Sequence, residues 1–116
     1  MRSLYEILAQ RSRRAQRYVR RPVPYVRRMA SLVRKALPDA RVVLFGSAAR
    51  GDSAPGSDID VLVISALIPE GLFEQARIKL QLSELFPEAP FEIHLVTPEE
   101  YQGWYAGFIG PEAMEL

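Results

Sequence analysis

The chain has 116 residues, of which 48% are apolar, and its formal net charge is +1 at pH 7. This length predicts one domain, and the lack of cysteine excludes disulfides, thiolate catalysis and cysteine-based zinc sites. With a single histidine in the chain, a divalent ion would be held by carboxylates, which favours hard ions such as Mg²⁺. The charge is divided unevenly: residues 1–40 carry eleven Arg or Lys against two acidic residues, and residues 41–116 carry four against twelve.

Two helices are predicted before the first strand. Apolar residues recur at helical spacing over residues 3–20, and the intervening arginines face elsewhere. Pro22 and Pro24 interrupt this pattern, and a second helical pattern runs over residues 26–37 until Pro38 stops it.

A strand, a turn and a second strand follow. The β-branched run at residues 41–45 predicts a buried strand that ends at Gly46. We expect a turn with a short helix at residues 47–51, a loop at 52–57 and a second strand at 58–64.

The last third of the chain predicts a helix, a strand and a helix. Pro69 opens a helix reaching about Phe86, whose apolar residues lie on two sides and predict burial on a broad face. Residues 91–96 alternate strictly and predict a third strand. Thr97 starts a capping box for a last helix. Its aromatic residues are expected to pack in the core, with exposure for a partner or a base left open; they are Tyr101, Trp104, Tyr105 and Phe108.

This order predicts an α/β (α+β) fold, with a small mixed β-sheet and helices packed on it. We expect one domain over residues 1–116. It would comprise a basic helical segment (1–38), a core (41–96) and a C-terminal helix (97–116).

Asp58 and Asp60 are the first candidates for chemistry. Asp is depleted in strands, yet these two are two residues apart, which places both side chains on one face about 7 Å apart. A metal ion between them would offset their like charges. The alternative is a solvent-facing strand end at which Asp58 only caps a turn.

Gly46 and Ser47 form the second candidate. A glycine that ends a strand, followed by exposed backbone N–H groups at a helix start, is able to bind phosphate, and the Ser47 hydroxyl adds a hydrogen bond. An ordinary tight turn is the alternative reading of this dipeptide.

The combination is more specific than its parts. The order along the chain is Gly46-Ser47, ten residues, Asp58, one residue and Asp60. This spacing resembles the G-S-x₁₀-D-x-D signature of minimal nucleotidyltransferases, a branch of the DNA polymerase β superfamily. The resemblance extends from about Arg41 to Val96 and implies the polymerase β-like nucleotidyltransferase fold.

The resemblance also implies roles for residues. Gly46 and Ser47 would bind the phosphates of ATP or another nucleoside triphosphate, and Asp58 and Asp60 would bind two Mg²⁺ ions. Glu92 would be the third catalytic and metal-binding carboxylate, although the family usually has Asp there. We expect three close carboxylates to raise at least one pKa in the metal-free protein.

Three further residues lie near these motifs. Arg50 lies between the two motifs and Ser57 directly precedes Asp58, and both are assigned to nucleotide binding. A solvated or salt-bridged role for Arg50 is the alternative. His94 shares the face of Glu92, either as part of the site or as a structural residue.

The leading hypothesis is a Mg²⁺-dependent enzyme that moves a nucleoside monophosphate, expected to be AMP from ATP, to a hydroxyl acceptor. The resemblance implies a small helical partner of the HEPN class and an antitoxin role. A catalytically weak or inactive antitoxin that masks its partner is the alternative. Nucleic-acid binding has only the excess of Arg and Lys in residues 1–40 in its favour. Whether the chain forms a homo-oligomer is left open.

The chain shows neither an apolar run long enough to cross a bilayer nor an apolar signal core at its start. We therefore expect a cytoplasmic protein with no membrane partner. Asn is absent as well as Cys, a feature of proteins from hyperthermophiles, so we expect a thermophile as the source.

Overall fold

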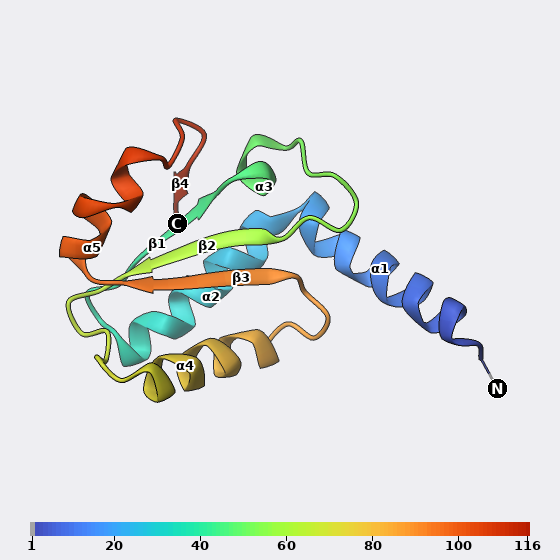
Figure 1. Cartoon of the computed structure of the whole chain (residues 1–116), viewed down its shortest axis with the longest axis horizontal. Coiled ribbons are helices and arrows are strands. Elements are labelled where there is room, and N and C mark those ends of the chain that lie inside the picture. Colours follow the sequence, from blue (N-terminus) through green and yellow to red (C-terminus); the bar gives the residue numbers. More distant parts are fainter. Residues whose placement is uncertain (1) are drawn as a thin grey trace.

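A four-stranded mixed sheet is the centre of the computed structural model, which describes residues 2–116 (Figure 1). The strand order is β3-β2-β1-β4. β1 is antiparallel to β2 and β4, whereas β2 and β3 are parallel. The strands are β1 (Arg41–Phe45), β2 (Ile59–Ile64), β3 (Phe91–Val96) and β4 (Met114–Glu115).

The helices confirm the predicted α/β class with two helices before the first strand. Ser3 caps α1 by accepting a hydrogen bond from the Glu6 N–H. Pro22 begins α2 instead of only ending α1, since a residue in the first helical turn needs no N–H donor. The helices are α1 (Leu4–Arg20), α2 (Pro22–Ala36), α3 (Ser47–Arg50), α4 (Leu72–Glu84), α5 (Pro98–Gly103) and the 3₁₀ turn η1 (Tyr105–Gly107).

The main hydrophobic core lies between one face of the sheet and the helices α2 and α4. It is built by alternate residues of each strand, as the period of two in a strand requires. Its buried members include Val26, Met29 and Val33 of α2, Val42 and Leu44 of β1, Ile59, Val61 and Val63 of β2, Leu82 of α4, and Ile93 and Leu95 of β3.

A smaller core lies on the opposite face of the sheet. Phe45, Leu62 and Val96 are buried there and are covered by Tyr101 and Tyr105 from α5 and η1. This cover extends along only part of the face, because α5 and η1 are short. The rest of the face is left for the polar residues described below.

The predicted C-terminal helix over residues 97–116 is wrong in its extent. α5 ends at Gly103, η1 follows, and β4 then pairs with β1 through Leu44 and Met114. Gly103 and Gly107 weaken a continuous helix, and β4 satisfies backbone groups that would be open at the β1 edge. A strand of two residues has too little pattern to be predicted from sequence.

Two helices expose more apolar surface than their patterns predict. Within α4 only Leu82 is buried, while Leu72 and Phe73 are each 82% exposed, so the predicted burial of a broad face is wrong. α1 projects from the sheet (Figure 1), and Leu4 near its free end is exposed. Outside these helices, Trp104 and Phe108 are also exposed, against the expectation of core packing. No helix within residues 2–116 is long and apolar enough to cross a bilayer.

The core assignment is tested by two leucine truncations. Leu44→Ala removes a fully buried side chain and should lower the free energy of unfolding by about 2–5 kcal/mol. Leu72→Ala, at an exposed position, should change it by less than about 0.5 kcal/mol. Urea unfolding of both variants measures the difference, and equal losses would contradict this placement of α4.

Candidate active site

Asp60 is the innermost carboxylate of the candidate site. Ile59 and Val61 point into the main core, so Asp60 points to the opposite face of β2. It lies opposite Phe45 on one side and Glu92 on the other. Its side chain is only 27% exposed, because the neighbouring strands surround it.

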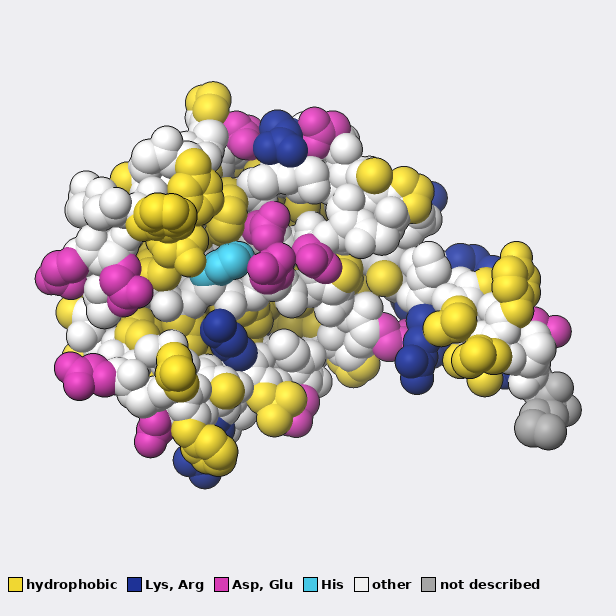
Figure 2. All heavy atoms as spheres, in the orientation of Figure 1, with side chains coloured by type: hydrophobic (Ala, Val, Ile, Leu, Met, Phe, Trp, Pro, Cys, Tyr) yellow, Lys and Arg dark blue, Asp and Glu magenta, His cyan; other side chains and the backbone are white. Residues whose placement is uncertain are grey.

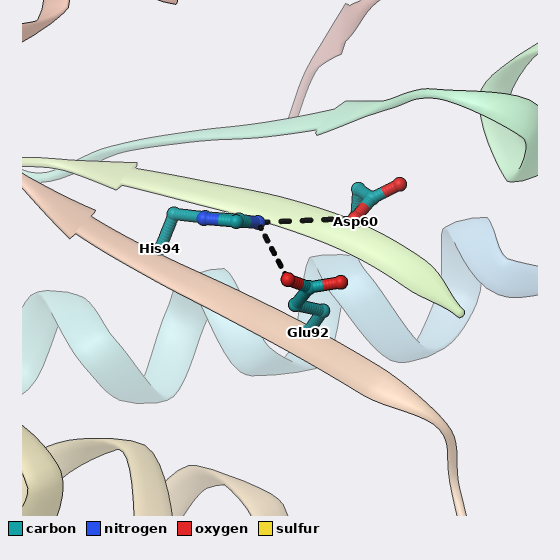
Figure 3. A group of neighbouring side chains, drawn as sticks. All are labelled: Asp60, Glu92 and His94. Atoms are coloured by element: carbon teal, nitrogen blue, oxygen red, sulfur yellow. Dashed lines mark ion pairs between the residues drawn. The ribbon is translucent and has the colours of Figure 1, made fainter.

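Glu92 and His94 are placed beside Asp60 by the parallel pairing of β2 with β3. The register pairs Asp60 with Glu92 and Leu62 with His94. His94 Nε2 lies 3.8 Å from Asp60 Oδ1 and 3.8 Å from Glu92 Oε1 (Figure 3). One ligand atom from each of the three residues lies within 4.8 Å of the others, as a shared metal ion requires. On the surface, the histidine borders a group of acidic side chains (Figure 2).

Asp58 stands next to this group, one residue before β2 begins. It is exposed, and its charge nevertheless raises the pKa of Asp60. The ladder between β2 and β3 starts at Ile59, so no residue of β3 is paired with Asp58. The close group therefore contains Asp60, Glu92 and His94, with Asp58 at its border.

The pKa of Asp60 is raised above its ordinary value. Burial is the largest cause, the charge of Glu92 follows, and His94 acts in the opposite direction. An increased pKa is what three neighbouring carboxylates were expected to produce, but its main cause is desolvation of Asp60 and not repulsion between carboxylates. A cation at this place would offset both effects.

Gly46 lies against the Asp60 carboxylate. Its φ is +77°, and a Cβ there would lie 2.6 Å from Asp60 Oδ2, closer than real contacts allow. Only glycine permits both this backbone conformation and this approach. The turn between β1 and α3 therefore borders the Asp60 carboxylate, as a phosphate-binding turn beside a metal site requires.

The other predicted nucleotide-binding residues are placed less directly. The Ser47 hydroxyl lies 3.1 Å from the Ser53 hydroxyl. Arg50 pairs with Asp52 and Glu112, each at 3.2 Å, which is the salt-bridged alternative. Ser57 lines a cavity of about 580 Å³ between α1 and the loop before β2, away from the close group of ligand atoms.

The side chains present fit a divalent cation. Two carboxylates and one imidazole converge, and Gly46 leaves space that a Cβ would fill. Carboxylate oxygens are ligands for Mg²⁺, and the imidazole adds a nitrogen ligand. The central position of His94 was not predicted, although its spacing of two from Glu92 placed both on one face.

Comparisons with known proteins agree with this geometry. A family model for the nucleotidyltransferase domain matches residues 26–105. The chain therefore belongs to the nucleotidyltransferase domain family, which confirms the resemblance found in the sequence. The match begins after α1, so α1 lies outside it.

Two solved structures are similar to this chain, and both carry the name nucleotidyltransferase provisionally. One is a 1.40 Å crystal structure from Sulfolobus solfataricus, with 21% identity, a TM-score of 0.56, and coverage of 88% of this chain and 85% of that chain. The other has 30% identity and a TM-score of 0.54, and covers 78% of this chain and 95% of that chain. No curated protein matches the chain.

Replacement of Gly46 tests the contact between the turn and Asp60. Gly46→Ala should lower the free energy of unfolding by roughly 1–3 kcal/mol through backbone strain, and should weaken divalent-ion binding because the new Cβ displaces the Asp60 carboxylate. Gly51 is the matched control, since its φ is +79° but nothing lies within 4 Å of a Cβ there. Gly51→Ala should cost about 1–2 kcal/mol and leave ion binding unchanged. Equal loss of ion binding in both variants would contradict the contact.

The raised pKa of Asp60 predicts a pH dependence of stability. A carboxyl group with a raised folded-state pKa contributes stability below its ordinary value of 3.8, and this contribution is lost as the pH rises through the folded-state pKa. In metal-free buffer, Asp60→Asn should therefore be more stable than the unmodified chain at pH 7, and this gain should vanish at low pH. Denaturant unfolding across pH measures it.

Asp39 gives the control of opposite sign. Hydrogen bonds from Ser65 and the Ala66 N–H lower its pKa. Asp39→Asn should therefore be less stable than the unmodified chain at pH 7, with the loss shrinking as the pH falls through the folded-state pKa. A gain for Asp39→Asn, or none for Asp60→Asn, would contradict this electrostatic account.

Proposed function

We propose that this chain is a Mg²⁺-dependent enzyme that transfers a nucleoside monophosphate, AMP from ATP, to a hydroxyl group. Its family already indicates nucleotidyltransferase-type chemistry. The observation that carries the proposal is the pairing of Asp60 with Glu92 beside the Gly46 turn. This arrangement sets negative ligands for cations next to a turn suited to phosphate.

The roles follow from position and exposure. The turn at Gly46 and Ser47 would hold the β- and γ-phosphates, and Asp58, Asp60 and Glu92 would hold the two Mg²⁺ ions. Bound ions supply charge neutralisation and a lowered pKa of the attacking hydroxyl. Asp60 is half-buried and therefore suits a fixed ligand. Glu92, with a side chain 54% exposed, is accessible to an acceptor from solution.

The reaction balances with these groups. The acceptor oxygen forms a bond to the α-phosphorus while the bond from this phosphorus to the bridging oxygen breaks. Pyrophosphate leaves, and Glu92 takes the proton of the acceptor hydroxyl. Positioning and charge neutralisation account for most of the catalysis in such transfers.

The acceptor is proposed to lie on a small helical partner protein of the HEPN class, which this chain would inactivate as an antitoxin. The resemblance to minimal nucleotidyltransferases motivates this partner, and the exposed Leu72 and Phe73 at the start of α4 offer apolar surface for one. Masking of the partner without turnover is the second candidate, because Glu92 replaces the usual Asp. In the enzyme, Arg50 and Ser57 would contribute to nucleotide binding only indirectly, because Arg50 is salt-bridged and Ser57 lines a separate cavity. A cytoplasmic location stays a prediction.

Transfer is tested with labelled ATP, Mg²⁺ and the protein encoded next to this chain, followed by mass analysis for an AMP adduct. Asp58→Asn and Asp60→Asn should each reduce transfer by at least about a hundredfold, since a neutral amide does not offset the charge of the ion. Glu92→Gln should reduce transfer steeply while ATP·Mg²⁺ binding persists.

Glu84→Gln is the control for loss of one negative charge, because Glu84 is exposed at the end of α4, which covers the other face of the sheet, and is distant along the helix from Leu72 and Phe73. This variant should transfer AMP as the unmodified chain does. Wild-type transfer no better than that of Glu92→Gln, with the partner neutralised by both, would instead favour masking.

A further inference from the structure

His94 is the one histidine of the chain, and its imidazole faces both inner carboxylates. Its two distances of 3.8 Å to Asp60 and Glu92 are longer than a hydrogen bond, which spans about 2.7–3.2 Å. Two ligands bound to the same ion at about 2.1 Å are separated by roughly 3–4 Å. The two distances from His94 are thus those of ligands of one ion, and the ligand atoms of all three side chains lie within 4.8 Å of one another.

The surroundings of His94 hold its ring in this orientation. The Phe45 ring of β1 has its centroid 5.7 Å from that of the imidazole, and the centroid of the Tyr105 ring of η1 lies 5.8 Å away. His94 itself is partly buried, so packing limits the rotation of the ring. Nε2 therefore points at the carboxylates without a large loss of side-chain entropy on metal binding (Figure 3).

The chemistry of this ligand set differs from that of carboxylates alone. Mg²⁺ prefers oxygen ligands and keeps several waters. An imidazole nitrogen favours borderline first-row transition ions, whose affinity for nitrogen ligands increases along the Irving–Williams order. Asp60, Glu92 and His94 combine two hard oxygens with one such nitrogen.

We propose that His94 is a metal ligand, and that with Asp60 and Glu92 it makes this position select a first-row transition ion over Mg²⁺. Mn²⁺ binds most weakly in that series and is therefore the most stringent probe of the preference. The inference rests on the metal-binding part of the proposed function and not on the identity of the nucleotide or acceptor. It concerns one of the two metal positions, at which a transition ion would bind in preference to Mg²⁺, and leaves the other position to Mg²⁺. Asp58, which borders the group, provides a carboxylate for the second ion of the pair. The selectivity is a property of this chain's own His94.

Metal binding itself is the test, on the full chain without a histidine tag. Electron paramagnetic resonance of free Mn²⁺ gives its affinity, and competition gives that of Mg²⁺. We expect Mn²⁺ to bind at least about tenfold more tightly than Mg²⁺. Pulsed measurement of bound Mn²⁺ should show hyperfine coupling to an imidazole nitrogen, and this nitrogen can come only from His94 because the chain has one histidine.

His94→Gln provides the matched variant, since its amide oxygen replaces the nitrogen with a hard ligand. It should weaken Mn²⁺ binding about tenfold, change Mg²⁺ binding less than about threefold, and abolish the nitrogen signal. Tyr105→Phe keeps the ring beside His94 and should preserve the preference for Mn²⁺. Thermal unfolding verifies that each variant is folded.

Absence of the nitrogen signal in the unmodified chain would overturn the proposal, whatever the variants do. Equal weakening of both ions in a folded His94→Gln would also overturn it and would assign His94 a structural role. The AMP-transfer assay is read separately. A nitrogen signal without transfer supports this inference and contradicts the enzyme, whereas transfer without the signal does the reverse.

Discussion

The parallel pairing of β2 with β3 is the constraint on which the candidate site depends. It sets Asp60 beside Glu92, and it brings His94 within reach of both. The connection between two parallel strands has to cross the sheet, and α4 does so while packing Leu82 into the main core. The apolar residues of β2 and β3 therefore fix the register, since a slip by one residue would turn Asp60 into the core and Val61 out of it.

The sequence predicted the parts of this arrangement that depend on local pattern. Strict alternation in residues 91–96 identified β3, and it is enough to assign Glu92 and His94 to one face without the strand pairing. The glycine after residues 41–45 predicted the turn correctly, because β1 ends at Phe45. These features need only the period of a strand and the conformational freedom of glycine.

Other features depend on contacts between distant residues and could not be predicted in this way. β4 is defined by its pairing with β1, not by its own composition. The exposed Phe73 has the same helical spacing as a core residue, and only the position of α4 on the sheet decides its burial. Likewise, the pKa of Asp60 is raised mainly by burial, which depends on the strands around it and not on the neighbouring acidic residues alone.

β3 is an edge strand of the sheet, with β2 on one side only. Glu92 therefore lies on an edge strand with its side chain exposed, and in the proposed reaction a large acceptor would reach it from the side without entering the protein. Such an open site would place little steric restriction on the acceptor hydroxyl. Discrimination between acceptors would then depend on how the whole acceptor docks on surfaces outside the chemical centre, and a change of docking partner could redirect the same carboxylates to a different hydroxyl.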